Sequence, residues 1–574
     1  MVVATLALAA DAFVLPAQPI ARVTDATTSD AIMAILASGR LPTSRWPLLT
    51  DVRADLRLLY GTGAAVPLWS TGGAATASAR VVVEQLGLLS YRGLEPGDYD
   101  ADSLRSFARR EFMSPQVAAA FDVGLTSASL RALRGLRHGQ IAVRDAHAAL
   151  QLAREPYDAV AAVRVLQTSV NPATQFDMAE PPFVHYRMLK DALARYHALA
   201  GDTSLAQITF NRPLRPGAID HAVPALRRLL VALGDLRAPM AGGIVGDSSR
   251  YASLLVAGVR RFQRRHGLPD DGVIGAGTRA RLTVPMSTRA TQIALTMERW
   301  RWLPQRLGEP PPIIVNVPAF RLHAFTSSSD SESGILGMNV VVGQAPKHRT
   351  PIFSGSLRHL IFSPYWDVPP SIMHKEILPK AYRDRGFLAR EDFEVVSNSG
   401  TVLGTSASAL NAAAAGRARI RQRPGMKNAL GGVKFVFPNS FNVYMHDTPT
   451  QKLFSRPRRD ASHGCIRLAE PARLAAMLLR DQPAWDSAAV ASAMSAGTPR
   501  QVNLTRPVPV FIVYATVVAR EDGSVFFFDD IYGHDRALTA LLRHGYPYGR
   551  SARSRLAIET NVRGTCQDEL DVTR

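Results

Sequence analysis

Cysteine is scarce in this chain. Only Cys465 and Cys566 occur among its 574 residues, and two cysteines allow at most one bridge, so the disulfide framework of small secreted domains is excluded. A single reactive thiol remains open. In an oxidising compartment Cys566 could bridge to Cys465 and silence it, but its C-terminal position favours an exposed, inert thiol.

Long apolar runs are also missing. No segment approaches the roughly 18 consecutive apolar residues that a membrane-spanning helix needs, so we predict no transmembrane span. The beginning, "MVVATLALAADAFVLPAQPIA", has a short apolar run and small residues near a plausible cleavage site, yet it lacks the basic stretch that opens a secretory signal. Residues 1–29 are therefore a candidate export segment and linker, and export by this segment stays open.

Acidic residues are fewer than basic residues in this chain. Lys and Arg together number 67 against 48 Asp and Glu, which leaves a formal charge of +19, and such a field attracts polyanions. Zinc-finger spacing, an RNA-binding sheet signature and basic heptads are all absent from the sequence. We therefore predict no nucleic-acid partner, because an anionic polymer of the cell envelope fits the charge as well.

What is present is ordinary globular composition at multidomain length. Apolar residues make up 47% and charged residues 20%, and at about 150 residues per domain the length predicts three or four domains. The fold class we predict is multidomain α+β. Its first part, 30–215, is a helical scaffold domain, in which Leu125, Leu130, Leu133 and Leu136 recur at helical spacing.

Residues 218–284 have the pattern of a compact module of short helices. Leu255, Val259 and Phe262 share one stripe of a helix, Gly267 stands where that helix would end, and "DDG" (270–272) predicts a turn. The combination of "VRRFQRRHGL" and "DGVIG" resembles the three-helix peptidoglycan-binding domain of many wall enzymes. An anonymous helical spacer is the alternative.

Residues 290–550 change to short β-branched and aromatic runs bounded by turn residues, which predict a β-rich domain. The runs are "PIIVNVPAFRLHAF" (312–325), "GMNVVVG" (337–343), "LRHLIFSPYWDVP" (357–369), "GVKFVF" (432–437), "NVYM" (442–445), "VPVFIVYATVVA" (508–519) and "SVFFFDD" (524–530). Residues 370–431 interrupt them with helical and loop character, and we interpret this insertion as a cap. Residues 551–574 form a C-terminal tail.

Cys465 lies in "SHGCIRL" (462–468), with His446 nineteen residues earlier at the end of a predicted strand. A catalytic cysteine needs an imidazole or a positive dipole nearby to become a thiolate at neutral pH, and Gly464 permits a sharp turn that directs backbone N–H groups toward the thiol. A buried structural cysteine and a zinc site using Asp447, His446, His463 and Cys465 are the alternatives, but the segment is polar and its spacing matches no familiar zinc pattern.

"YMHDTP" (444–449) followed by "SHGCIRL" resembles the catalytic motif of the L,D-transpeptidase family. "RQRPGMKNALGGVKFVFPN" (421–439), "YWDVPPSI" (365–372), "MERWRWLP" (297–304) and "DIYGHD" (530–535) are similar to the large multidomain subgroup of that family. The resemblance spans most of the chain. It implies a helical scaffold, a wall-binding module and a β-rich L,D-transpeptidase domain with an inserted cap.

The resemblance assigns catalytic roles to five residues. It makes Cys465 the nucleophile and His446 the base that takes its proton, and the carbonyl of Asp447 orients the imidazole. His463 and Gly464 are implied to shape the oxyanion pocket. Neither a metal nor an organic cofactor is implied, because a thiolate and oxyanion donors suffice.

Four further residues are implied to contact substrate: Tyr444, Arg467, Ser462 and Trp366. Tyr444 lies two residues before His446 on the same predicted strand and therefore shares its face. Arg467 would hold a carboxylate or brace the loop, and both roles stay open.

The implied reaction uses peptidoglycan tetrapeptide stems as donor and acceptor and forms 3-3 crosslinks through a cysteine thioester, with release of D-alanine. Penems and carbapenems are expected to acylate Cys465. The resemblance implies a periplasmic or cell-envelope location, with other wall-synthesis proteins as candidate partners. An L,D-carboxypeptidase with the same thiol and a noncatalytic wall-binding protein are the alternatives.

Overall fold

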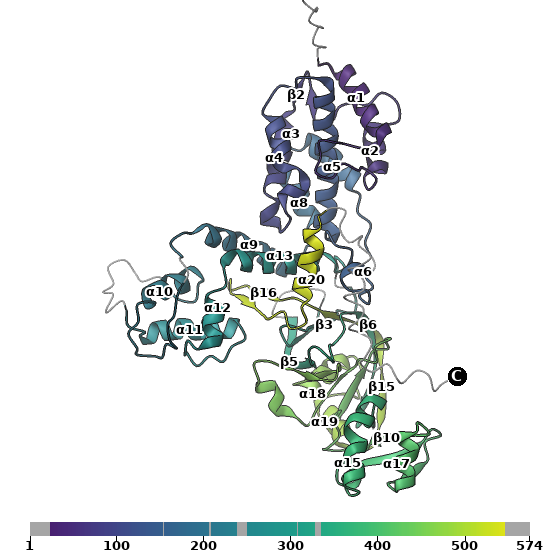
Figure 1. Cartoon of the computed structure of the whole chain (residues 1–574). Helices are drawn as coiled ribbons and strands as arrows, with labels where there is room; N and C mark the ends of the chain where they lie inside the picture. Colours follow the sequence, from purple (N-terminus) through teal and green to yellow (C-terminus); the bar gives the residue numbers. More distant parts are fainter. Residues whose placement is uncertain are drawn as a thin grey trace, which may run out of the picture. The chain divides into compact units, whose positions relative to one another are not determined.

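The computed structural model describes residues 23–152, 154–205, 208–237, 249–306, 308–327 and 334–545 (Figure 1). These residues form two compact units. Most of the candidate export segment, the tail at 551–574 and Cys566 lie outside the described residues. No described helix is long and apolar enough to cross a bilayer.

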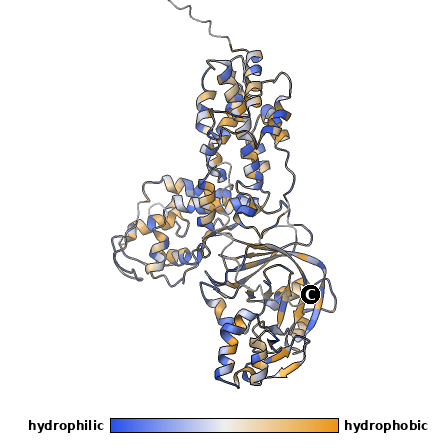
Figure 2. Ribbon diagram, turned by 45° about the vertical axis from the view of Figure 1, so that its right-hand side comes forward, coloured by the Kyte–Doolittle hydropathy of each residue, from blue (hydrophilic) through white to orange (hydrophobic). Residues whose placement is uncertain are grey.

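Within the described residues, unit 1 comprises 23–88, Glu95–Leu133 and Asp158–Asp177, and it is helical, as predicted for the scaffold. Figure 2 shows polar and apolar residues mixed along its helices, the pattern of helices that bury one face. Its main helices are α1 (Asp25–Ser38), α2 (Arg53–Tyr60), α3 (Ala77–Gly87), α4 (Ala101–Ala108), α5 (Pro115–His138, which leaves the unit after Leu133), α7 (Ala159–Thr168) and α8 (Ala173–Ala179).

A buried carboxylate organises unit 1. Asp122 on α5 is fully buried and accepts hydrogen bonds from the hydroxyl of Tyr60 (2.7 Å), the amides of Leu68 and Trp69 (2.9 Å each) and the hydroxyl of Ser70 (2.8 Å). Burial raises the pKa of Asp122, and these hydrogen bonds offset part of that rise. The carboxylate thus ties α5 to the segment before the hairpin β1 (Ser70–Thr71) and β2 (Ala74–Ala75).

Unit 2 contains a helical layer built on α9 (Val184–Gly201) and α13 (Met286–Arg301), which pack together, and a module of α10 (Val223–Ala232), α11 (Ser253–Arg265) and α12 (Ala276–Leu282). The prediction of a three-helix module is confirmed. Leu255, Val259 and Phe262 are buried in one core with α9 and α13. Gly267 follows the end of α11 in the left-handed conformation (φ 64°).

Residues 508–513 join the main β-sheet of unit 2, but the rest of the predicted runs at 508–519 and 524–530 does not. Residues 517–527 form a separate hairpin, β16 (Val517–Ala519) and β17 (Val525–Phe527), whose Val517, Val525 and Phe527 are buried in the core of the helical layer. The sequence interpretation that placed them in the β-rich domain was wrong in this respect. An apolar run shows that a strand is buried, but not which partner buries it.

The remaining strands form a nine-stranded sheet in the order β13-β5-β14-β12-β11-β6-β15-β3-β4, and β4 pairs again with β5, so the sheet closes. The strands are β3 (Ile313–Asn316), β4 (Arg321–Phe325), β5 (Ile335–Gly343), β6 (Ser354–Phe362), β11 (Val433–Val436), β12 (Met445–His446), β13 (Asp460–Ser462), β14 (Ile466–Leu468) and β15 (Arg500–Val513). Helices α18 (Pro471–Leu478), α19 (Ser487–Ser495) and α20 (His534–Arg543) contribute apolar residues to its core.

The insertion at 370–431 folds around its own small core, which also includes Val368 and contacts Trp366. Its helices are α14 (Pro370–Ile372), the π turn Met373–Ile377, α15 (Leu378–Arg383), α16 (Phe387–Arg390) and α17 (Ala407–Ala414), and its strands are β7 (Trp366–Asp367), β8 (Phe393–Ser397), β9 (Val402–Gly404) and β10 (Ala418–Gln422). The expectation of helix and loop alone was therefore incomplete. Arg419 and Arg421 take the half-buried positions of β10, and its other three positions are buried.

Candidate active site

The site is built on two short parallel strands. In β12 and β14, Met445 pairs with Ile466 and His446 pairs with Arg467, and the amide of Ile466 donates to the carbonyl of Tyr444 (3.0 Å). Met445 and Ile466 are fully buried in the sheet core. Because side chains alternate along a strand, the residues on either side of them share the opposite face.

This register brings the predicted residues together. Tyr444, His446, Cys465 and Arg467 project from one face of neighbouring strands, although nineteen residues separate the histidine from the cysteine in sequence. The Tyr444 and His446 rings lie 5.6 Å apart. The Cys465 thiol is half-buried and donates to the carbonyl of Asn442 (Sγ···O 3.8 Å).

His446 is held in one tautomer. The residue is 4% exposed, and Nδ1 lies 2.5 Å from the carbonyl oxygen of Asp447. A carbonyl only accepts, so Nδ1 carries the proton and Nε2 keeps its lone pair. Burial, with a smaller contribution from the cations of Arg467 and Lys434, lowers the pKa of His446 to about 3, so the imidazole is neutral at physiological pH.

Arg467 places a positive charge beside the thiol. Burial lowers its pKa, while a thiolate at Cys465 would favour its charged form, and by the same attraction Arg467 stabilises that thiolate. The buried Nε of Arg467 has no hydrogen-bond partner within the described part of the chain. This unused donor favours carboxylate binding over a purely bracing role.

The turn before the thiol requires glycine. Gly464 has φ 121°, a backbone conformation that a β-carbon disfavours. Ser462 donates through Oγ to the carbonyl of Cys465 (2.6 Å) and accepts from the amide of Gly464 (3.1 Å). The Gly464 amide, which the sequence interpretation directed toward an oxyanion, is therefore engaged inside the turn in this state.

The carboxylate of Asp447, directly after β12, accepts hydrogen bonds from two backbone amides. Its oxygens accept from the amides of Gly432 (2.8 Å) and Thr448 (2.7 Å), and burial raises its pKa. Because Gly432 directly follows the insertion, Asp447 links the end of the cap to the strand that carries His446.

The cap reaches the motif through His463. Nε2 of His463 lies 2.8 Å from Oε1 of Glu376, in the π turn of the insertion, and its ring lies 4.7 Å from that of His348. Trp366, predicted as a substrate contact, lies in β7 of the cap sheet with its ring 6.1 Å from Phe393. The cap core thus accounts for its apolar ring.

Two positioning residues escaped the sequence reasoning. Thr350 donates to the carbonyl of Gly464 (2.8 Å) and accepts from the amide of Gly343 (2.8 Å). The hydroxyl of Tyr532 donates to the carbonyl of Gly343 (2.5 Å) and accepts from the amide of Thr350 (3.1 Å). Tyr532 belongs to the "DIYGHD" segment, so its position had a sequence signal, whereas that of Thr350 had none.

The site has no metal-binding character where the structure describes it. No group of three or more His, Cys, Asp or Glu side chains within the described ranges is arranged to hold a metal ion. A zinc interpretation of the motif therefore has no support from its geometry.

Comparisons with known proteins agree with this arrangement. Residues 310–509, which contain the whole motif, match the family model described as "L,D-transpeptidase catalytic domain". This part of the chain is an L,D-transpeptidase catalytic domain. Residues 54–193 match a "Scaffold domain" and residues 220–282 a "Putative peptidoglycan binding domain".

A curated relative points the same way. The Haemophilus influenzae protein named "Putative L,D-transpeptidase" is 29% identical over 251 residues, which are 43% of this chain. The match spans about half (48%) of the relative's own length. The family assignment thus rests on the catalytic domain together with the two accompanying domains.

Proposed function

We propose that this L,D-transpeptidase family member forms 3-3 crosslinks in peptidoglycan with Cys465 as nucleophile and His446 as base. The parallel pairing of β12 with β14 is the observation that carries the proposal, because it sets a neutral imidazole with a free Nε2, a thiol and a cation on one face. That arrangement is the minimum for nucleophilic acyl transfer.

The first step releases D-alanine. Nε2 of His446 takes the thiol proton, and Sγ of Cys465 attacks the carbonyl carbon of the third residue of a tetrapeptide stem. The C–N bond to D-alanine then breaks, and the imidazolium returns its proton to the departing amine. The turn at 462–465 stabilises the oxyanion, and Arg467 binds a substrate carboxylate.

The second step decides the product. A side-chain amine of another stem attacks the thioester, the C–S bond breaks, and the thiol is regenerated. Attack by water on the same thioester would be hydrolysis, which is the reaction of an L,D-carboxypeptidase. The cap, which reaches the motif through Glu376 and His463, favours transfer by limiting access of water to the thioester.

The direct test is product analysis. The full chain is incubated with disaccharide-tetrapeptide, and the products are identified by mass spectrometry. We expect a dimer lighter than two substrates by one D-alanine. Tripeptide without dimer would show that the enzyme hydrolyses the stem and does not crosslink it. Unchanged substrate would favour the noncatalytic wall-binding alternative.

The cap contact makes a second prediction. Glu376→Ala should raise the ratio of hydrolysed to crosslinked product by roughly 2- to 5-fold, because a half-exposed contact between polar side chains contributes at most about 1 kcal/mol. Deletion of the cap should raise it further. The ratio is read from the same mass spectra.

The matched control is Glu391→Ala, which removes an exposed acid from the same cap without a contact to the motif. An unchanged ratio in both Glu376→Ala and the cap deletion would contradict the proposed role of the cap.

The proposed setting is the periplasm or cell envelope of a bacterium, where peptidoglycan stems are the donor and acceptor. The wall-binding module and the positive charge of the chain support it. Other wall-synthesis proteins are proposed partners.

A further inference from the structure

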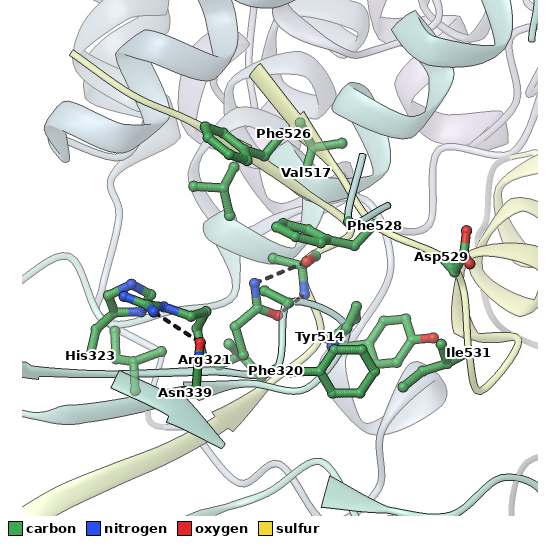
Figure 3. Close-up of a pocket in the computed structure, with 18 of the residues that line it drawn as sticks. Phe320, Arg321, His323, Asn339, Tyr514, Val517, Phe526, Phe528, Asp529 and Ile531 are labelled. Atoms are coloured by element: carbon green, nitrogen blue, oxygen red, sulfur yellow. Dashed lines mark hydrogen bonds between the residues drawn. The ribbon is translucent and has the colours of Figure 1, made fainter. Parts of the chain in front are cut away.

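A cavity of about 920 Å³ lies within unit 2, away from the thiol, and neither Cys465 nor His446 lines it. Figure 3 shows Phe526 and Phe528, from and just after the β16–β17 hairpin, on one side, and Arg321, His323 and Asn339 of strands β4 and β5 on the other. Residues 454–459, on the segment that leads to the motif, line it as well. A volume of this size holds a ligand of several sugar or amino-acid residues.

Three arginines converge on this cavity, and we call them the arginine cluster: Arg321, Arg459 and Arg520. The Oδ1 atom of Asn339 accepts hydrogen bonds from Nη1 of Arg321 (3.0 Å) and from Nη2 of Arg459 (3.3 Å). Two guanidinium groups that share one acceptor oxygen are held a few ångströms apart. Arg520 stacks over Phe526, with its guanidinium carbon 4.4 Å from the ring centre.

These cations repel one another. Burial, and then the charge of Arg520, lower the pKa of Arg321. Burial, and then the charge of Arg321, lower the pKa of Arg459 to about 10. Both shifts mean that the two positive charges are only partly compensated within the protein. Arg459 does donate to the backbone carbonyls of Val340, Arg456 and Phe320, which carry no full negative charge.

The acids of the cavity do not supply that compensation. Asp270 pairs with Arg264 (2.9 Å) and Asp529 with Arg281 (2.5 Å). No ion pair joins the arginine cluster to an acid among the residues that the structure describes. Glu470 attracts Arg321 weakly, but Glu470 is itself paired with Arg473.

A buried arginine elsewhere in the lining of the cavity also lacks hydrogen-bond acceptors for some of its donors within the described chain. Arg299 is 7% exposed and lines the cavity, with its guanidinium 5.4 Å from the ring of Tyr514. Its Nη1 donates to Asp535 (2.5 Å), whereas Nε and Nη2 have no hydrogen-bond partner in the described residues. An unsatisfied buried donor is costly unless a ligand supplies an acceptor.

We infer that this cavity binds a carboxylate-bearing segment of peptidoglycan, with the carboxylate on the arginine cluster and an apolar or sugar face against Phe320 and Phe526. The identity of the polymer rests on the proposed function, whereas the anionic chemistry rests on the cavity itself. The cavity thus holds peptidoglycan at a point separate from Cys465. Arg459 lies six residues before Cys465 in the sequence. A ligand in the cavity therefore also contacts the segment that leads to the motif.

The test is binding by a catalytically silent protein. The full chain with Cys465→Ala is titrated with disaccharide-tripeptide, with and without the triple change Arg321→Gln, Arg459→Gln and Arg520→Gln. We expect the triple change to weaken binding on the order of 10-fold, and amidation of the ligand's carboxylates to weaken binding to the unchanged cluster similarly. The charge-matched control changes Arg358, Arg506 and Arg543 to Gln, three exposed arginines outside the cavity, and should bind like the parent.

Three outcomes would overturn the inference. They are equal binding by the triple variant and the control, equal binding of amidated ligand, and full displacement by inorganic phosphate at millimolar concentration, which would mark a general anion site. If the triple variant melts early, Arg520→Gln alone, on an exposed residue, replaces it. Because the assay needs no turnover, a wild-type chain that makes no product would defeat the proposed transpeptidation and leave this result standing.

Discussion

Replacing Cys465 with alanine should abolish both tripeptide and dimer formation, a loss of at least about 10³-fold, because no thioester can form without the sulfur nucleophile. Product formation from disaccharide-tetrapeptide is the measurement. Cys465 is half-buried and its hydrogen bond to the Asn442 carbonyl is long, at 3.8 Å, so we expect the variant to keep its melting temperature.

A covalent probe gives the same prediction an independent readout. A carbapenem should add its mass to the intact wild-type chain and leave the Cys465→Ala chain unchanged. Cys465→Ser, which keeps a hydroxyl in place, should remain below about 1% of wild-type turnover. Product or adduct in the alanine variant would mean that another group is the nucleophile.

Replacing His446 with asparagine should lower kcat/KM by roughly 10²- to 10⁴-fold, the usual contribution of a general base. The amide nitrogen of asparagine occupies the position of Nδ1 and keeps the bond to the Asp447 carbonyl, while the proton-accepting Nε2 disappears. The change therefore separates base catalysis from support of the strand. His544→Asn, on an exposed histidine at the end of α20, is the control and should match wild type.

The pH profile sharpens this prediction. Because burial lowers the pKa of His446 to about 3, protonation removes the base only as pH falls toward that value. An unperturbed histidine with a pKa near 6.5 would cost about 30-fold in kcat/KM between pH 8 and pH 5. We expect less than about 3-fold over that interval, and a full 30-fold loss would contradict the neutral buried imidazole.

Sequence reasoning located a candidate motif where the pattern is local. The SHGC segment and the histidine at a strand end were recognisable because a turn residue, a thiol and an imidazole must follow one another in a particular order. It failed where burial depends on distant partners. The run at 517–527 predicted strands correctly but not their place against the helical layer, and the five-residue strand β10 was not recognised inside the insertion.

The sequence by itself carried the resemblance to the L,D-transpeptidase family, the proposal of Cys465 and His446 as nucleophile and base, and the order of scaffold, wall-binding module and β-rich domain, since each rests on residues close together along the chain. Only the tertiary structure decided that β12 and β14 pair in parallel, that Thr350 and Tyr532 buttress the turn, and that Glu376 of the cap meets His463. It also gathered Arg321, Arg459 and Arg520, almost 200 residues apart at the extremes, around one cavity. Strand pairing and ion pairing join residues by distance in space, which local patterns do not encode.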